Sequence, residues 1–311
     1  MTVNVLVLNF DGKDLLEKYL PSIERAVRRS RHECRLGIVD NGSQDGSVEF
    51  LRNRFPDVRI FEAKENRVLC SYNDVAVKLD ENILIFMNND IQVDENFVDP
   101  LVEPFDRSGD IFFVTPRCLS PKDGSYEGNK TKGMIRRGVY WSSALYPGYE
   151  LGIGKPGPTM QGGFGAFDRK KFLELGGYDD LYLPGRLEDA DICFRAYKRG
   201  WKCLYEPASV VYHEGGVSFK KRFGNRGMLV INWRNTFLFM IKNLSDRMTL
   251  VKFLLWLPFQ ALYALIFFKP EFIIGLFKSL PLLKEALRRR QELKRSGHLE
   301  AVPDREIFDV I

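Results

Sequence analysis

The chain has 311 residues, of which 45% are hydrophobic and 28% are charged, and this balance is typical of a globular protein and excludes extensive disorder. Its five cysteines are odd in number and show no Cys-x-x-Cys spacing, which argues against a disulfide framework or a zinc site and fits a reducing compartment. The formal net charge is +5, and basic runs at 220–222 and 288–290 lie late in the chain near apolar sequence, which favours an anionic membrane surface over nucleic acid.

Short apolar runs alternate with helical patterns through the first half of the chain. Residues 3–8 form an almost continuous apolar run, which is typical of a strand buried on both faces of a parallel sheet, and the N-terminus lacks the pattern of a signal peptide. Further strands are predicted at 36–39, 58–61, 83–87 and 111–115, and helices at 15–27, 48–55 and 72–79. This order predicts an α/β fold with a mostly parallel sheet.

Polar residues follow three of the predicted strands. Ligands of such sheets bind outside the carboxyl ends of the strands, and that edge carries Asn9, Asp11, Asp40, Asn88, Asn89 and Asp90. Asp90 follows the buried strand 83–87 and is a candidate ligand for a hard divalent cation, although it also suits the cap of a following helix. Asp40 can accept hydrogen bonds from a base or a ribose, although Asn41-Gly42 after it is a strong turn signal.

The regular pattern is lost at 117–159, where glycines and prolines crowd residues 148–158 and indicate a mobile loop, either a lid over a site or an insertion. Order returns at 161–172, and a helix is predicted at 187–198. Three carboxylates, Glu188, Asp189 and Asp191, stand at the start of that helix. They suit the positive end of the helix dipole, but they exceed what a cap needs, so one of them is a candidate catalytic group.

His213 ends another apolar run, next to a glycine-rich turn, and both a structural role and a ligand role are open for it. After Gly224 the character of the chain changes, which divides it into a domain at 1–224 and a helical region at 225–311. The latter contains apolar stretches at 249–268 and 272–283 followed by a basic tail. The uncharged part of the first stretch is shorter than the roughly 20 residues that span a bilayer. A pair of interfacial helices is therefore expected, with a soluble helical subdomain as the alternative.

These segments, in this order, resemble the family-2 glycosyltransferases with the GT-A fold, and above all rhamnosyltransferase-like members that build bacterial surface polysaccharides. The resemblance covers residues 2–220. The matching segments are 7–10, 39–47, 65–73, 87–90, 162–167, 188–191 and 212–213. The resemblance implies a Rossmann-like sheet flanked by helices, a nucleotide-sugar donor and a divalent metal, Mg²⁺ or Mn²⁺.

The resemblance also implies a role for each candidate residue. Asp40 binds the nucleotide base, with Asn9 and Asp11 nearby, and the rest of the donor is bound by Asn66, Asn73, Asn88 and Asn89. Asp90 and His213 hold the metal on the diphosphate, and Asp189 is the general base. Two features depart from the family pattern. Asn88 stands where many members carry an aspartate, and 67–72 replaces a glycine-rich stretch. A Gln-x-x-Arg-Trp run is absent, which argues against a processive cellulose- or chitin-type synthase.

The expected activity is therefore inverting transfer of a sugar to a hydroxyl of a glycan or a lipid-linked glycan, at the cytoplasmic face of the plasma membrane. In such a reaction one carboxylate takes the acceptor proton and no covalent intermediate is needed. A nucleotidyltransferase acting on sugar phosphates is an alternative, although it would normally carry a glycine-rich basic signature where this chain has residues 9–12. A second alternative is a catalytically inactive, transferase-like membrane scaffold.

Overall fold

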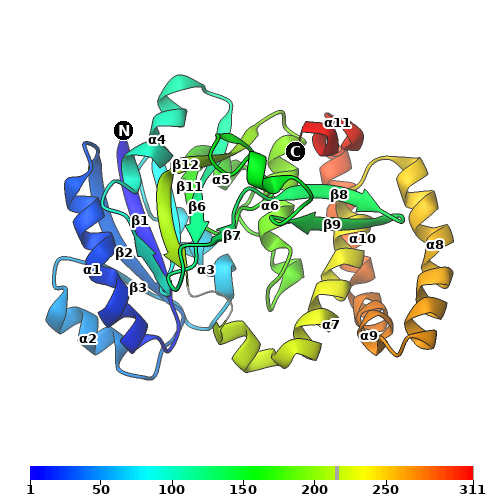
Figure 1. The fold of residues 1–311 in the computed structure, drawn as a ribbon, viewed down its shortest axis with the longest axis horizontal. Coiled ribbons are helices and arrows are strands. Elements are labelled where there is room, and N and C mark those ends of the chain that lie inside the picture. The colour runs from blue at the N-terminus through cyan, green and yellow to red at the C-terminus, as the bar shows by residue number, and fades with distance from the viewer. Residues whose placement is uncertain (214–216, 311) are drawn as a thin grey trace.

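The computed structural model describes residues 1–213 and 217–310. Its main feature is a large sheet with strand order β10-β12-β6-β11-β4-β1-β2-β3, in which β5 also pairs with β12 and β7 with β6 (Figure 1). The strands are β1 (Thr2–Asn9), β2 (Glu33–Asp40), β3 (Arg59–Glu62), β4 (Ile83–Asn88), β5 (Ile91–Val93), β6 (Ile111–Leu119), β7 (Tyr126–Gly128), β8 (Lys132–Arg136), β9 (Val139–Ser143), β10 (Gly157–Pro158), β11 (Gly165–Asp168) and β12 (Lys202–His213). The helices are α1 (Lys13–Arg29), α2 (Ser47–Arg54), α3 (Ser71–Ala76), α4 (Val98–Arg107), α5 (Arg169–Glu174), α6 (Glu188–Tyr197), α7 (Val217–Asn243), α8 (Arg247–Ile266), α9 (Pro270–Ser279), α10 (Leu283–Arg295) and α11 (Asp304–Val310).

The N-terminal half of the sheet is parallel. β1 pairs in parallel with β2 and β4, and β2 pairs in parallel with β3. The apolar runs of these strands are buried on both faces, as with Val5 and Leu6, which are fully buried and belong to opposite clusters of the core. The α/β class predicted from the sequence is confirmed. Parallel pairing brings the carboxyl ends of β1, β2 and β4 to one edge, where Asn9 lies in register with Asp40.

The other half of the sheet is mixed in direction, so the sheet as a whole is less parallel than the sequence predicts. β11 runs antiparallel between β4 and β6, and β12 is parallel to β6 but antiparallel to β5 and β10. Because β11 is opposed to β4, its first residue, Gly165, lies beside Phe86 near the end of β4. Residues 162–164 therefore reach the same edge as the polar ends of β1, β2 and β4.

Helices cover both faces of the sheet. α1 and α4 pack on one face around Leu16 and Leu101, while α3, α5 and α6 pack on the other around Tyr72, Phe172 and Phe194. The irregular stretch predicted at 117–159 contains β7 and a separate hairpin of β8 and β9. The expected mobile loop at 148–158 is anchored, because Lys130 Nζ donates hydrogen bonds to the carbonyls of Gly152 and Lys155 at 2.8 and 2.9 Å.

The C-terminal helices share the core of the sheet. Gly224, with a φ of 63°, interrupts α7 at the predicted boundary between 1–224 and 225–311. Beyond this kink, Phe237, Phe239 and Phe272 belong to the same buried cluster as Tyr72 and Phe194. The division into domains at 1–224 and 225–311 stays a prediction. Removal of 225–311 would expose this cluster.

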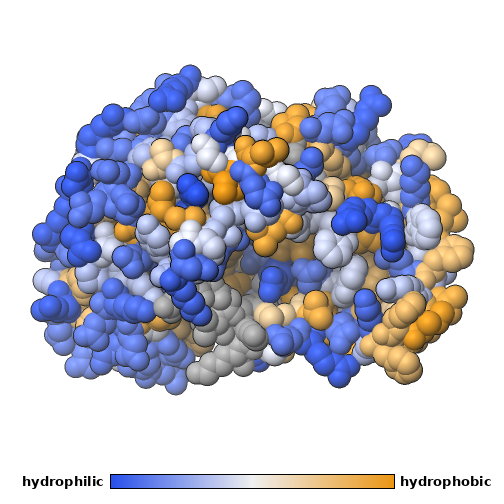
Figure 2. Space-filling model, in the orientation of Figure 1, coloured by the Kyte–Doolittle hydropathy of each residue, from blue (hydrophilic) through white to orange (hydrophobic). Residues whose placement is uncertain are grey.

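α8 is the exception to this packing. It has 20 residues, and its most apolar 18-residue window has a mean hydropathy of 1.6, so it is long and apolar enough to cross a membrane; yet only 11% of that window is buried. Phe259, Leu255 and Leu265 are 64–65% exposed on it, and Phe268 just beyond its end is 90% exposed. The apolar surface at the right-hand end of the molecule in Figure 2 lies over this helix. α8 is attached to the domain by two buried residues, Phe253 in its first half and Ala264 near its C-terminal end.

Candidate active site

The polar side chains at the strand ends form a closed hydrogen-bond network. Asp40, 1% exposed, accepts hydrogen bonds from the backbone N–H of Gly42 and Ser43 at 3.1 and 2.8 Å and from the Ser43 hydroxyl at 2.7 Å. Asn9 donates to Asp40 at 2.9 Å and accepts from Asn89 at 2.7 Å. The structure thus brings together three of the predicted donor-binding residues, and the turn signal after Asp40 is also correct.

Asp11 stands at the exposed side of this network. Its Oδ1 accepts a hydrogen bond from the Gln44 N–H at 2.7 Å, and its backbone N–H donates to Ser43 at 2.9 Å. Gly12 must lack a side chain, because a Cβ there would lie 2.1 Å from the amide nitrogen of Asn89. Phe10 is 43% exposed beside Asp11 and gives the edge an aromatic ring that sequence reasoning did not select.

Asn66 and Asn73 lie farther along the predicted donor segment. The side-chain oxygen Oδ1 of Asn66 accepts hydrogen bonds from the Val68 N–H at 2.9 Å and from Nδ2 of Asn41 at 3.2 Å, which orders the turn before α3. The amide of Asn73 clasps the backbone of Tyr178, donating to its carbonyl at 2.8 Å and accepting from its N–H at 2.9 Å. These contacts give Asn73 a structural task, and its contact with a donor remains a prediction.

Asp90 and His213 are neighbours, as the resemblance implies. β5 pairs with β12 so that Ile91 faces His213, and this register places Oδ1 of Asp90 3.2 Å from Nε2 of His213. Asp90 Oδ1 is buried and has no hydrogen-bond partner among the described residues. Because an unpartnered buried carboxylate oxygen is costly, the pair fits a cation that both side chains could bind. Asn88 ends β4 two residues earlier and is half-buried.

An open cleft of about 390 Å³ lies on the other side of residues 162–164. Glu188 and Asp189 at the start of α6 line it, together with Gln161 and Gly163 before β11 and Ser142 to Ala144 at the end of β9. Burial raises the pKa of Asp189 above its usual range. Burial and the adjacent charge of Asp189 raise the pKa of Glu188 to about 8, and Oε2 of Glu188 is buried with no hydrogen-bond partner among residues 1–213 and 217–310.

Gly162 lets α6 approach the sheet edge closely, and Gly163 lies beside Asp189 at an ordinary contact distance. A Cβ at Gly162 would lie 2.8 Å from the carbonyl oxygen of Asp189 and 2.9 Å from Sγ of Cys193. A Cβ at Gly163 would lie 3.8 Å from Cβ of Asp189. Phe164, the next residue, meets the ring of His213 edge-on, with centroids 5.8 Å apart. Residues 162–164 therefore connect the Asp189 cleft to the Asp90–His213 pair.

The turn before α6 is strained and is held from α7. Arg186 and Leu187 adopt positive φ values of 76° and 67°, which are rare for residues other than glycine. Asn235 of α7, fully buried, donates its amide hydrogens to the carbonyls of Tyr182, Gly185 and Arg186 at 2.8–2.9 Å. The C-terminal region thereby positions the carboxylates at the start of α6.

Asp191, the third carboxylate, points away from the cleft into the core. Lys242 and Asn243 of α7 contact its Oδ1 at 2.6 and 2.7 Å, and Arg195 contacts its Oδ2 at 2.6 Å. Burial alone would raise the pKa of Asp191, but the charges of Lys242 and Arg195 hold it well below its usual range. Its place at a helix start suits the helix dipole, but these contacts make Asp191 the centre of a buried ion-pair network between α6 and α7.

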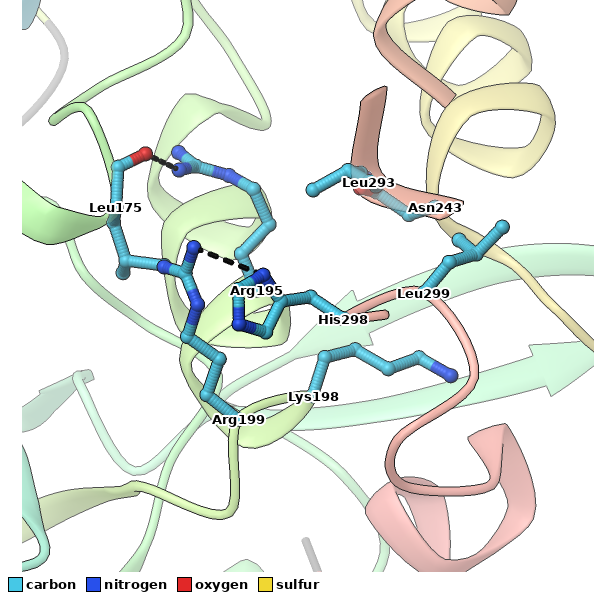
Figure 3. A pocket seen from close by; sticks show the side chains of 8 residues that line it. All are labelled: Leu175, Arg195, Lys198, Arg199, Asn243, Leu293, His298 and Leu299. Atoms are coloured by element: carbon cyan, nitrogen blue, oxygen red, sulfur yellow. Dashed lines mark hydrogen bonds between the residues drawn. The ribbon is translucent and has the colours of Figure 1, made fainter. Parts of the chain in front are cut away.

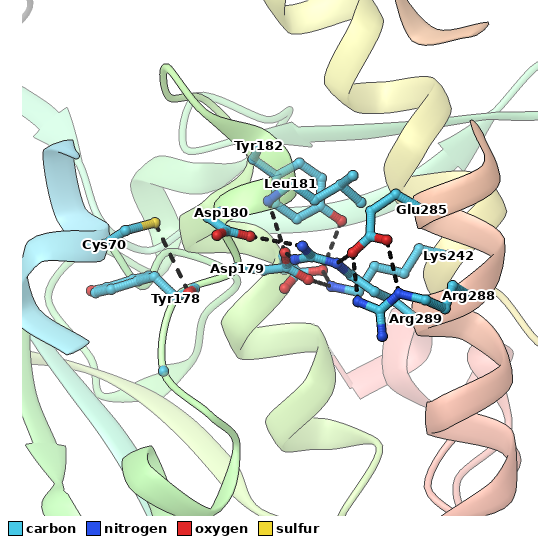
Figure 4. Close-up of polar contacts among 12 residues, drawn as sticks. Cys70, Tyr178, Asp179, Asp180, Leu181, Tyr182, Lys242, Glu285, Arg288 and Arg289 are labelled. Atoms are coloured by element: carbon cyan, nitrogen blue, oxygen red, sulfur yellow. Dashed lines mark hydrogen bonds and ion pairs between the residues drawn. The ribbon is translucent and has the colours of Figure 1, made fainter. Parts of the chain in front are cut away.

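This network continues to the C-terminal helices. Lys242 also contacts Asp179 at 2.5 Å, and Arg289 of α10 contacts both Asp179 and Asp180 (Figure 4). A second, smaller cavity of about 20 Å³ lies where α6 meets the C-terminal residues, between Arg195, Arg199 and His298 (Figure 3). It holds little more than one water, so the cleft at Asp189 is the better candidate for a substrate.

Comparisons with known proteins agree with this geometry. A model of the family described as glycosyl transferase family 2 matches residues 5–176, which is more than half of the chain. The chain belongs to this family. One relative is an N-acetylglucosaminyl-diphospho-decaprenol L-rhamnosyltransferase of Mycobacterium tuberculosis, 24% identical over 233 residues, 67% of this chain and 75% of the relative.

Two solved structures share the fold. GalNAc-T7, solved with UDP, GalNAc and Mn²⁺, aligns with a TM-score of 0.58 at 19% identity, over 79% of this chain and 48% of that chain. A mannosyltransferase of Pyrobaculum calidifontis, solved with GDP-Man and Mn²⁺, aligns with a TM-score of 0.52 at 14% identity, over 94% and 86%. The predicted GT-A fold and the membership in family 2 are therefore confirmed, and the chain is a glycosyltransferase by family.

Proposed function

We propose that the protein is a metal-dependent, inverting glycosyltransferase that moves a sugar from a nucleotide-sugar donor to a hydroxyl of a lipid-linked glycan during the synthesis of a cell-surface polysaccharide. The observation that carries the proposal is the position of Asp189, which lines an open cleft and is joined by residues 162–164 to the Asp90–His213 pair. Direct displacement at a sugar carbon needs a base close to a donor-binding centre, and one short segment lies between the two here.

Asp189 is the proposed general base. The acceptor oxygen attacks the anomeric carbon as the bond to the nucleoside diphosphate breaks, and Asp189 takes the acceptor proton. Because burial raises the pKa of this carboxyl, it holds the proton more firmly than an exposed aspartate would. Inversion follows from a single displacement, in which no enzyme side chain is bonded to the sugar.

The strand-end network is the proposed donor site. Asp11 and Phe10 are exposed at its outer side, where a base or ribose can reach them, while Asn9, Asp40 and Asn89 hold the shape of the edge. The proposed donor site also includes Asn66, Asn73 and Asn88. Asp90 and His213 are proposed to hold Mg²⁺ or Mn²⁺, which when bound neutralises negative charge on the departing diphosphate.

The acceptor is proposed to be lipid-linked. The mycobacterial relative is described as acting on a decaprenol diphosphate. In this chain, Gly138 before β9 packs against the backbone of Lys252 and Phe253 of α8, and β9 ends at the Asp189 cleft. We place α8 in the interface of the cytoplasmic leaflet rather than across it, because its attachment through Phe253 and Ala264 keeps one side on protein along its length.

A product assay tests the activity. The full chain is first screened against nucleoside diphosphates with Mn²⁺ or Mg²⁺ by thermal shift, because a ligand that binds only the folded state raises its apparent stability. The matching sugar nucleotide is then incubated with a polyprenyl-diphosphate sugar. Release of nucleoside diphosphate with growth of the lipid-linked glycan is expected. Release of pyrophosphate would indicate a nucleotidyltransferase, and binding without turnover would indicate a scaffold.

A flotation assay tests the membrane attachment. The wild-type chain is expected to float with anionic liposomes, and a Phe259→Glu/Leu262→Glu variant is expected to stay in solution, because both side chains are more than half exposed on α8. Leu151→Glu is the control, since Leu151 is 84% exposed and lies outside α8. Equal flotation of wild type and the α8 variant would overturn the placement of α8.

A further inference from the structure

His213 also belongs to a second group of possible metal ligands, whose other members, Cys118 and Glu127, receive no role from the family resemblance. Sγ of Cys118, a carboxylate oxygen of Glu127 and a ring nitrogen of His213 all lie within 4.8 Å of one another. Two ligands about 2.0–2.4 Å from one ion on opposite sides are separated by about this distance. The three atoms are therefore close enough to bind one cation.

Sheet register explains the convergence of residues that are far apart in the sequence. On β6, Cys118 pairs with Gly128 of β7 and with Val211 of β12. Glu127 adjoins Gly128, and His213 lies two residues beyond Val211 and so on the same face of β12. The β6–β7 hairpin thus brings a carboxylate to the end of β12 from within the 117–159 stretch.

Asp90 adjoins the set through His213. Its Oδ1 lies 3.2 Å from Nε2 of His213, is buried, and has no hydrogen-bond partner in the described part of the chain. Cys118 is 2% exposed at the floor of the set, while Glu127 is exposed at its mouth. A buried carboxylate oxygen without a hydrogen-bond donor, next to an imidazole, is costly, and a bound cation would satisfy it.

We infer that Glu127 and Cys118 are further protein ligands of the divalent cation that Asp90 and His213 are proposed to hold. The inference rests on that proposed metal site and extends it to a mixed nitrogen, oxygen and sulfur ligand set. Six-coordinate Mn²⁺ bound by these four groups retains two positions for diphosphate oxygens. The thiol adds affinity for softer ions such as Co²⁺ and Zn²⁺, and the cation fastens β7 to β5 and β12.

The first arm of the test measures Mn²⁺ binding by electron paramagnetic resonance, with the full chain and no substrate. Glu127→Gln is expected to raise the Kd for Mn²⁺ by at least about 10-fold, since groups that support a metal site contribute that much or more. Glu150→Gln is the matched control, because Glu150 is an exposed glutamate of the same stretch. A wild-type Kd for Glu127→Gln overturns the assignment of Glu127.

The second arm replaces Mn²⁺ with Co²⁺ and records the near-ultraviolet spectrum. A thiolate-to-cobalt charge-transfer band is expected for wild type and is expected to be lost in Cys118→Ala; a spectrum without a band that depends on Cys118 overturns that assignment. Asp90→Ala distinguishes failure of the proposed metal site from failure of its extension to Glu127 and Cys118. If it too binds Mn²⁺ with the wild-type Kd, the proposed metal site itself fails. If it loses Mn²⁺ while Glu127→Gln retains it, only the extension to Glu127 fails.

Discussion

Polar side chains gather both at the strand-end edge and at the start of α6, but the two regions differ in whether these side chains have hydrogen-bond partners. At the edge, Asn9, Asp40 and Asn89 satisfy one another and are almost completely buried or half-buried. At the start of α6, Glu188 keeps a buried oxygen without a partner among the described residues and Asp189 faces a cleft. The first arrangement holds the edge of the sheet in one conformation. The second leaves two carboxyl groups, whose pKa values are raised, able to take up or release a proton.

The same contrast exists within α6. Asp189 and Asp191 are two residues apart, yet one has its pKa raised by burial and the other has its pKa held low by Lys242 and Arg195. Local sequence is nearly the same for both, so the difference comes from what packs against each side of the helix. Function is therefore better sought where a buried polar group lacks partners than where acidic residues are merely numerous.

The largest expected effect is on catalysis. Asp189→Asn retains the size of the side chain but removes the basic oxygen, and loss of a general base costs about 10²- to 10⁴-fold in kcat. Donor affinity measured by calorimetry on the same preparation is expected to stay near the wild-type value. If Asp189→Asn transfers sugar at the wild-type rate while folded Glu188→Gln is inactive, the base is Glu188.

Asp191→Asn is expected to act on stability instead. It leaves Arg195 buried without its anionic partner and removes one of the two carboxylates that Lys242 contacts. Breaking a buried ion pair in this way lowers the free energy of unfolding by about 3–5 kcal/mol. Urea denaturation measures the loss. Asp110→Asn is the control, because Asp110 forms an exposed pair with Lys202 and its loss costs about 0–1 kcal/mol. Equal losses for the two variants would contradict the network.

Glu188 is expected to make stability depend on pH. Its pKa is raised from 4.5 to about 8 in the fold, so between these pH values the unfolded chain loses a proton that the folded chain keeps. The free energy of unfolding therefore falls as pH rises through this window, by at most about 1.4 kcal/mol per pH unit. Glu188→Gln removes this contribution. Denaturation at pH 5 and pH 7.5 should show a smaller loss for Glu188→Gln than for wild type, and parallel losses would refute the buried acid.

The smallest effects are expected at the strand ends. Asp40→Ala leaves the N–H groups of Gly42 and Ser43 without their acceptor and is expected to lower the free energy of unfolding by about 1–3 kcal/mol. Asp11→Ala, at an exposed position, is expected to change it by less than about 0.5 kcal/mol while weakening nucleotide binding. An Asp40→Ala protein with wild-type stability would show that Asp40 serves the ligand and not the turn.

The sequence predicts those elements that have a local pattern of apolar and polar residues. The apolar runs of β1, β2 and β4 and the polar residues that follow them were predictable, because a buried parallel strand has a continuous signature. β11 was not predicted as a strand, since Gly165–Asp168 is short and its antiparallel insertion depends on both neighbours. The partners of Asp191 lie on α7, and Cys118, Glu127 and His213 meet only through sheet register, so no window of sequence contains either set.

The contact between Gly162 and α6 has a consequence for protein engineering. Any side chain at position 162 would collide with the carbonyl of Asp189, with Cys193 and with Ile192, so this part of the cleft cannot be changed by substitution unless α6 moves. Ser142, Ser143 and Ala144, at the end of a two-stranded hairpin, also line the cleft. Libraries intended to change the proposed acceptor specificity should therefore hold position 162 constant and vary 142–144.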